Sequence, residues 1–245
     1  DQNSHMRANH TIASGCNIGY YALNQSHIDG DYTISVANTD DGFYCANNSS
    51  INAKGSLSCL NGGYGFSAVD SSTLRLTKQT SVKDEYNETL KTGTGEAYRY
   101  ASSDKTGAFG FRNTKSGVFA ESSTVYAANS RMSYNQESGY VAFNNATIDA
   151  WRANAWFNGF TGASQTTDYD WQGSGFAAVH GSKIITGGAL SKWNWQDGFY
   201  IIDGSYMVGG SCTADNNARG TYHAQKIIPK GYKATHIMVK GSSAS

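Results

Sequence analysis

Proline, charge and long apolar runs are all scarce in this chain. Only 1 of its 245 residues is proline, 16% are charged, and 19 Lys and Arg residues balance 19 Asp and Glu residues. Without an excess of positive charge, no bulk field draws the protein to nucleic acid or to an anionic membrane surface. No run of about 20 apolar residues is present, so no transmembrane helix is expected. We therefore expect no nucleic-acid partner, no membrane insertion, and partners with neutral or polar surfaces.

Cysteine is also scarce, and its positions form no recognisable pattern. The chain has four cysteines, Cys16, Cys45, Cys59 and Cys212, and neither a CxxC nor an HExxH spacing occurs. We expect buried free thiols that pack as small apolar side chains, and favour this over disulfides. No zinc-ligand spacing is present, so neither a metal site nor a cofactor is expected.

Glycine is abundant, with 28 residues, and it opens a unit that returns along the chain. In residues 42–51 the unit has a glycine, an aromatic residue, a small residue two places later, a polar turn, and an aliphatic residue nine places after the glycine. Such units start at Gly19, Gly42, Gly65, Gly139, Gly175 and Gly198, with a unit one residue shorter at Gly117. Most consecutive starts are 22 or 23 residues apart, which is the signature of a repeat architecture.

Aligned on their glycines, the units place similar side chains in the same columns. The position after the glycine is aromatic in six of seven units, and the third position is mostly alanine. This alternation predicts a strand whose first and third residues face the same side. The fifth column holds Asn, Asp or His and the seventh mostly Ser, and such columns can hydrogen-bond between stacked turns. One turn cannot bury its own aromatic residue, so the predicted fold is all-β, a parallel β-helix (β-solenoid).

Two longer gaps predict insertions. The gap from Gly65 to Gly117 is 52 residues, which we interpret as two coils, one of them degenerate at residues 95–116, plus an insertion near residues 77–94. The gap from Gly139 to Gly175 is 36 residues and predicts a coil with an insertion near residues 160–174. About eight coils then span residues 15–211, after an entry segment or linker at residues 1–14. The repeat fades from residue 212, so residues 212–245 are predicted to form a small C-terminal β module, complete or truncated.

Tryptophan is concentrated in one part of the chain. All five tryptophans lie between residues 151 and 195, together with Tyr169. Aromatic faces stack on the apolar faces of sugar rings, which predicts a glycan-binding surface. An inter-subunit seam or a place in the helix core is an equally weighted alternative. The candidate glycan-binding residues are Trp151, Trp156, Tyr169, Trp171, Trp193 and Trp195.

Asp168 and Asp170 are the candidate catalytic residues. They lie two positions apart, so on a strand they would share one face, and paired carboxylates beside aromatic residues are what glycosidic cleavage uses. A solvated loop is the favoured interpretation of these acids, which makes an enzyme the less favoured class. Glu137, Asp149, Asp197 and Asp203 are the next acids along these coils, and Asp203 lies in a polar column and is expected to be structural.

The Gly-aromatic-x-Ala-x-Asn-x-Ser-x-Ile unit resembles the β-helical tail fibres and tailspikes of bacteriophages over residues 15 to about 210. Residues 227–239 also resemble segments of structural proteins from marine phages. The resemblance implies a viral protein of the virion tail, located outside the cell: a homotrimer that contacts other tail proteins and attaches to a host surface glycan or receptor. It carries over no catalytic motif. Two other functions stay open, a polysaccharide-degrading tailspike (glycoside hydrolase or lyase) and a bacterial surface adhesin.

Overall fold

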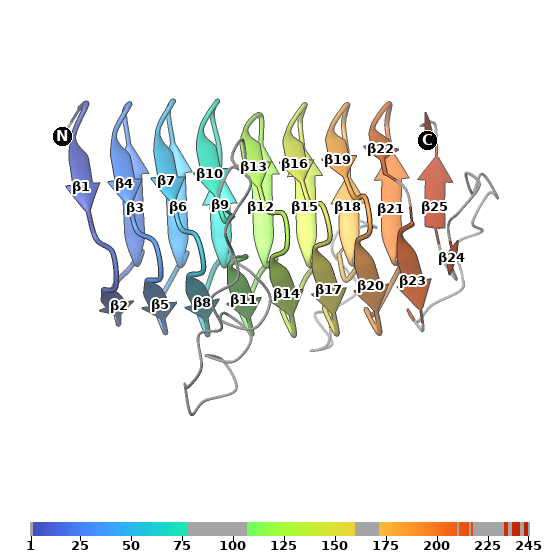
Figure 1. Ribbon diagram of the computed structural model, residues 1–245, viewed down its shortest axis with the longest axis horizontal. Helices are drawn as coiled ribbons and strands as arrows, with labels where there is room; N and C mark the ends of the chain where they lie inside the picture. The colour runs from blue at the N-terminus through green and yellow to red at the C-terminus, as the bar shows by residue number, and fades with distance from the viewer. Residues whose placement is uncertain are drawn as a thin grey trace, which may run out of the picture.

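The computed structural model is a parallel β-solenoid built from three long sheets (Figure 1). It describes residues 2–77, 107–159, 172–209, 211–215 and 217, and the strand residues 233–234, 237–240 and 243–244. These residues include no helix, and so none that could cross a bilayer. The predicted all-β parallel β-helix is confirmed.

The sheets contain 9, 9 and 8 strands and are called A, B and C. Sheet A consists of β1 (His5–Arg7), β4 (His27–Asp29), β7 (Ser50–Asn52), β10 (Thr73–Arg75), β13 (Thr124–Tyr126), β16 (Thr147–Asp149), β19 (Lys183–Ile185), β22 (Tyr206–Val208) and β26 (Ser243–Ala244). Sheet B consists of β2 (Ile12–Ser14), β5 (Ile34–Val36), β8 (Leu57–Cys59), β11 (Phe109–Phe111), β14 (Arg131–Ser133), β17 (Asn154–Trp156), β20 (Leu190–Lys192), β23 (Thr213–Asp215) and β24 (Lys233–Ala234). Sheet C consists of β3 (Tyr20–Leu23), β6 (Phe43–Ala46), β9 (Phe66–Ala68), β12 (Val118–Glu121), β15 (Tyr140–Phe143), β18 (Phe176–Ala178), β21 (Phe199–Ile202) and β25 (Ile237–Lys240).

Each turn contributes one strand to each sheet, and every strand pairs in parallel with its counterpart one turn away. In the first turns Tyr20 pairs with Phe43 in sheet C and Ile28 with Ile51 in sheet A. The partners are 23 residues apart in both sheets, so the sequence period equals one turn of the solenoid.

The leading glycine of each turn is required by the close approach of the next turn. A Cβ atom on Gly42 would lie 2.7 Å from the carbonyl oxygen of Gly65 and 2.0 Å from Ser58 Oγ. Gly19, Gly65, Gly139 and Gly175 would each clash in the same way with the carbonyl oxygen of the following glycine, at 2.6 to 2.7 Å. Only a residue without a Cβ fits where two backbones come this close, which explains the glycine period.

The aromatic column after the glycine forms a stack inside the solenoid. The ring centroids of Tyr20 and Phe43 are 4.7 Å apart, those of Phe43 and Phe66 are 4.8 Å apart, and those of Phe176 and Phe199 are 5.1 Å apart. These spacings match the separation of neighbouring strands, about 4.8 Å. The inward first and third positions of sheet C therefore form the core, as the alternation predicted.

A ladder of seven asparagines runs along the inside where sheet B ends, and the sequence analysis did not find it. The side-chain Nδ2 of each of the first six donates to Oδ1 of the asparagine on the next turn, at 2.8 to 3.0 Å. All seven side chains are buried, so every amide needs these partners. The ladder consists of Asn38, Asn61, Asn113, Asn135, Asn158, Asn194 and Asn217.

The two predicted polar columns have different roles. In the serine column, the backbone N–H of one turn donates to the serine Oγ of the next, as from Ser26 to Ser49 at 3.2 Å and from Ser182 to Ser205 at 3.0 Å. The Asn, Asp and His column lies at a corner where every residue has a φ between 50° and 55°. Asn and Asp tolerate this left-handed conformation better than most residues. Backbone shape, more than a hydrogen-bonded ladder, explains this second column.

The prediction of a degenerate coil at residues 95–116 is wrong. β9 pairs directly with β12, with Phe66 opposite Val118, and β8 pairs directly with β11. The 52-residue gap is therefore a single turn with one long insertion between β10 and β11, and the described residues contain seven glycine-led turns. Residues 78–106, which include the predicted insertion at 77–94 except for Thr77, lie outside the described residues, as do residues 160–171 of the second insertion.

Strand pairing continues into both ends of the chain. β1 and β2, within the predicted entry segment, pair with β4 and β5. At the other end β24, β25 and β26 pair in parallel with β23, β21 and β22. The strands of residues 212–245 thus extend the three sheets of the solenoid, and the pairing shows no boundary at residue 212.

All four cysteines are free, as predicted. Cys45 and Cys212 are buried and Cys59 is partly buried, but Cys16 is exposed, which corrects the expectation of four buried thiols. Burial raises the pKa of the Cys45 thiol far above its usual range. Cys45 therefore acts as a small apolar side chain in the alanine column.

Candidate functional site

The outer face of sheet B carries a group of aromatic side chains over four consecutive turns. They come from the ends of β11, β14, β17 and β20 and from the corner that follows each strand. We call this group the aromatic strip; it consists of Phe109, Phe111, Tyr134, Trp156, Phe157 and Trp193.

The centre of the strip is a continuous stack. The ring centroids of Tyr134 and Phe157 are 4.9 Å apart with an interplanar angle of 12°, and those of Phe157 and Trp193 are 5.0 Å apart with an angle of 14°. Phe111 extends the stack by an edge contact with Tyr134 at 5.5 Å. Tyr134, Phe157 and Trp193 each occupy the first corner position after a sheet B strand with a φ between 51° and 56°. The repeat thus places these three equivalent corner positions on successive turns, one strand spacing apart.

Cationic groups cover other ring faces of the strip. The Arg131 guanidinium lies 3.8 Å from the centroid of Trp156, and the Lys192 ammonium lies 5.4 Å from that of Trp193. Lys192 also pairs with Asp215 at 3.3 Å. The indole Nε1 of Trp156 is buried and has no hydrogen-bond partner among the described residues. The strip therefore combines apolar ring edges with charged donors and an acceptor.

The exposed end of the strip is at Trp193. This side chain is 41% exposed, and the nearby Trp195 is 39% exposed. Inside the stack the ring faces cover one another, so a bound molecule would meet ring edges there and would find open indole surface at Trp193 and Trp195. Large exposed aromatic side chains on a folded surface mark sites of recognition.

The structure brings together only some of the predicted glycan-binding residues. Trp156 and Trp193 are 6.4 Å apart at an angle of 82°, and Trp195 follows on the same corner. Trp151 is 48% exposed but lies at the corner between sheets A and B, where its ring packs over Gly187 of the next turn. Tyr169 and Trp171 lie outside the described residues, as do both candidate catalytic residues, Asp168 and Asp170.

Of the other acids, Glu137 contacts Gln172, in the described part of the second insertion. Its carboxylate accepts hydrogen bonds from Ser116 Oγ at 3.1 Å and from Gln172 Nε2 at 3.4 Å. Burial raises the pKa of Glu137, against the opposing effects of Ser116 and Lys115. Asp203 pairs with His180 at 3.3 Å.

The stacking of Tyr134 and Phe157 was not predicted, although the sequence contains a signal for it. Each stacked residue directly precedes an asparagine of the ladder, in the pairs Tyr134-Asn135, Phe157-Asn158 and Trp193-Asn194. An alignment of the second half of each turn on these asparagines places the three aromatics in one column.

The solenoid is similar to known β-helical structures. The crystal structure of pectate lyase Pel9A matches it with a TM-score of 0.50 and 12% identity, over 91% of this chain and 55% of that chain. The crystal structure of the Agl-KA catalytic domain matches with a TM-score of 0.44 and 8% identity, over 100% of this chain and 48% of that chain. This chain thus spans about half the length of the solved structures it matches. No protein-family model matches the chain, and no curated protein sequence is similar to it. At 12% identity, the likeness to Pel9A shows the fold alone: a parallel β-helix like that of this pectate lyase.

Proposed function

We propose that this chain is the receptor-binding part of a phage tail fibre and that the aromatic strip, together with Trp195, contacts a host surface glycan. One observation carries the proposal: a rigid stack of aromatic rings that ends in two exposed tryptophans on a repeating scaffold. The resemblance of the repeat unit to phage tail fibres and tailspikes supports the biological setting.

The chemistry of the strip suits a sugar chain. Sugar rings have apolar faces that stack on indole and polar edges that need hydrogen bonds. At the exposed end, the indoles of Trp193 and Trp195 offer stacking surfaces, and Lys192 and Asp215 offer hydrogen-bonding groups. The rungs are spaced by about 4.8 Å, so a linear glycan lying along the solenoid axis would meet the same corner on successive turns.

The proposed assembly is a homotrimer in the virion tail, outside the cell, in contact with other tail proteins. Sedimentation of the full chain tests this part. A species with three times the mass of the chain supports it, and a monodisperse monomer contradicts it.

Binding to a panel of bacterial surface polysaccharides tests the proposed site. Replacement of both Trp193 and Trp195 by alanine is expected to weaken binding by at least about tenfold, because truncating a central aromatic anchor costs more than 1 kcal/mol. Trp151→Ala is the matched control, since Trp151 is equally exposed but lies at another corner. Equal losses in both variants, or a loss with Trp151→Ala alone, would contradict the assignment to the strip.

A polysaccharide-degrading tailspike is the second candidate. It is supported by Glu137, a partly buried acid with a raised pKa that is hydrogen-bonded to Gln172, close in sequence to Asp168 and Asp170. A general acid needs such a raised pKa, and a second carboxylate then acts as base or nucleophile. Pel9A, which shares the fold, is a pectate lyase by name.

Chromatography of the polysaccharides after incubation separates the two candidates. New reducing or unsaturated ends that disappear in Glu137→Gln, or in Asp168→Asn with Asp170→Asn, would establish cleavage. Retention of the glycan without new ends would support a fibre that only binds.

A further inference from the structure

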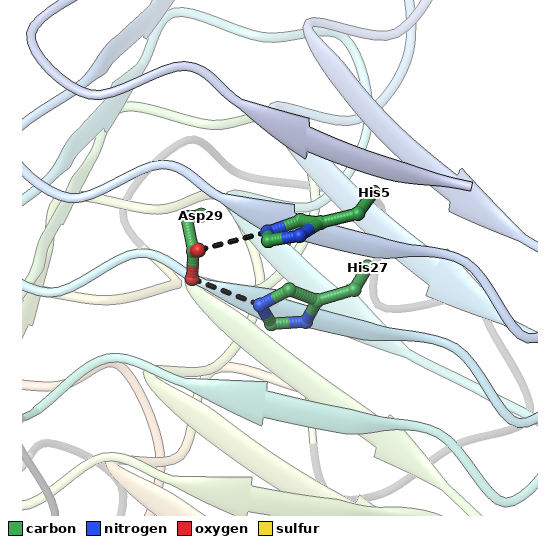
Figure 2. Close-up of side chains that lie close together, drawn as sticks. All are labelled: His5, His27 and Asp29. Carbon is green, nitrogen blue, oxygen red and sulfur yellow. Dashed lines mark hydrogen bonds and ion pairs between the residues drawn. The ribbon is translucent and has the colours of Figure 1, made fainter. Parts of the chain in front are cut away.

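Two histidines and an aspartate meet on the outer face of sheet A, at the first two turns. His5 on β1 lies opposite His27 on β4 in the parallel register, and Asp29 follows two positions along β4 on the same face. Figure 2 shows both imidazole rings side by side, each directed at the Asp29 carboxylate. None of the three belongs to the aromatic strip or to the predicted glycan-binding set.

The three side chains converge on one point. His5 Nε2 lies 2.9 Å from Asp29 Oδ2, and His27 Nε2 lies 2.8 Å from Asp29 Oδ1. One ligand atom from each of the three residues lies within 4.8 Å of the other two. An imidazole nitrogen faces a carboxylate oxygen only when a proton or a metal ion lies between them.

Neighbouring groups on β7 hold two of these side chains in place. Ser50 Oγ lies 2.6 Å from His27 Nδ1, and Asn52 Nδ2 donates to Asp29 Oδ1 at 2.7 Å. A hydrogen bond at Nδ1 fixes the orientation of the ring and leaves Nε2 as the ligand atom, which is the usual support of a metal-binding histidine. If the His27 proton resides on Nδ1, Ser50 Oγ accepts it and the Nε2 lone pair is free for a metal ion.

The present distances are close to those of a metal site. With bonds of about 2.0 to 2.2 Å, two ligand atoms of a tetrahedral zinc ion lie about 3.3 Å apart. The two nitrogen–oxygen distances, each to a different oxygen of Asp29, are about 0.4 Å shorter than this value, so an ion would bind both carboxylate oxygens or the side chains would rotate toward one of them. His5 and His27 are 49% and 30% exposed, which leaves room to adjust. Two imidazoles and one carboxylate suit zinc, cobalt or nickel, whereas calcium and magnesium require mostly oxygen ligands.

We propose that His5, His27 and Asp29 form a binding site for one divalent transition-metal ion of the zinc class, which ties β1 to β4 at the start of the solenoid. Three protein ligands leave at least one position for water or another ligand. The site is independent of the proposed glycan binding and lies on a different sheet.

Titration of the untagged full chain with Co²⁺, followed by its visible absorption, and with Zn²⁺, followed by calorimetry, tests the proposal. We expect one ion per chain, with the strong absorption of tetrahedral cobalt. His27→Gln and Asp29→Asn are expected to abolish the binding, and Asn52→Ala, which removes the supporting contacts to Asp29 and His27 but no ligand atom, is expected to weaken it about 10- to 100-fold.

His180→Gln is the matched control. His180 also pairs with an aspartate, Asp203, on the same solenoid, but no third ligand joins this pair among the described residues. Circular dichroism checks that each variant keeps its fold, which is expected because these side chains are partly exposed. Absence of binding in the unmodified chain, or binding that survives His27→Gln and Asp29→Asn in folded protein, would overturn the proposal.

Discussion

The inside and the outside of this solenoid differ in how strictly their side chains repeat. Inside, the asparagine ladder extends over seven turns without interruption, and within the seven glycine-led units the aromatic column departs from aromatic character only at Val118. Outside, the face of sheet B changes from Leu57 and Cys59 on one turn to Phe109 and Phe111 on the next.

The difference follows from what each side chain contacts. An inward residue touches its equivalents on the turns before and after it, so any change leaves a gap, a clash or an unpaired amide for its neighbours. An outward residue has solvent on one side and is free to vary. Stability therefore depends on the repeated columns, while the unrepeated outer residues are available for recognition.

Gly42→Ala is expected to have the largest effect on stability. The new Cβ would lie 2.7 Å from the carbonyl oxygen of Gly65, a backbone atom that cannot rotate away. We expect a loss of about 3 kcal/mol, at the upper end for overpacking, measured by thermal or denaturant unfolding. Gly204→Ala is the comparison: a Cβ there meets nothing within 4 Å, and only the φ of 70° opposes it. Equal losses at both positions would show that backbone conformation, and not close approach, requires the glycine period.

Asn158→Ala breaks the ladder at its centre. The side-chain oxygen of Asn158 accepts from the backbone and the side chain of Asn135, and its Nδ2 donates to Met132 O and to Asn194 Oδ1. Truncation removes the shared acceptor of the two Asn135 donors and a donor from Met132 O, while Asn194 Oδ1 keeps only the backbone N–H of residue 158, so we expect a loss of about 2 to 3 kcal/mol in unfolding free energy.

Asn47→Gly is the control for the ladder variant. Asn47 is an exposed asparagine at a corner with a φ of 55°, which glycine adopts freely, so its replacement should cost little. A ladder variant as stable as this control would mean that the buried amides contribute nothing net to stability.

How much of the structure could be predicted differs between the two halves of each turn. In the first half, glycine, aromatic, alanine and serine columns are all set by contacts between turns, so their 22- or 23-residue period is visible in the sequence and predicted the solenoid. In the second half only Asn38 and its equivalents repeat strictly, because the outer positions of sheet B vary. The ladder was missed for that reason. The long insertion before Gly107 also exceeds one period, which caused an extra coil to be counted.

The candidate site was predicted in part for a related reason. Closeness in the sequence grouped Trp151 with Trp156, but in a solenoid the phase within the turn decides which corner a residue occupies. Trp151 lies 12 positions after Gly139 and Trp156 lies 17 positions after it, so they occupy different corners. Phe157 and Trp193 lie 18 positions after Gly139 and Gly175, so they occupy the same corner on neighbouring turns. The proposed metal site combines His5 and His27 from neighbouring turns, and neither carries a ligand spacing of its own.

Asp197 is a buried acidic residue, whereas most buried residues of the solenoid are uncharged. Asp197→Asn tests what this buried charge costs. Burial raises the pKa of Asp197 to about 6, above its ordinary value of 3.8. The folded state therefore holds this proton more tightly than the unfolded state, and stability is lost as the pH rises from about 4 to about 6. Asparagine carries no charge, so we expect the variant to be more stable at pH 7 by on the order of 1 to 3 kcal/mol.

Unfolding midpoints measured between pH 3.5 and pH 8 (about the window set by the two pKa values) check this expectation. The gain should shrink toward zero at the acid end, where the native aspartate is protonated in both states. Asp41, whose pKa burial also raises to about 6, remains in the variant and should keep a part of the pH dependence. A gain that does not change with pH would indicate better packing instead of a removed charge.

Trp193→Ala is expected to have the smallest effect on stability. It is also the clearest test of the difference between the inside and the outside of the solenoid. Trp193 is 41% exposed and stacks face to face on Phe157, with an edge contact to Trp156, so its removal should lower the unfolding free energy by less than about 1 kcal/mol. The same change should weaken glycan binding, because it removes the open end of the aromatic strip. A large loss of stability with unchanged binding would show that the strip is structural. It would also contradict the inference that the unrepeated outer residues serve recognition, because the aromatic strip is the main case for it.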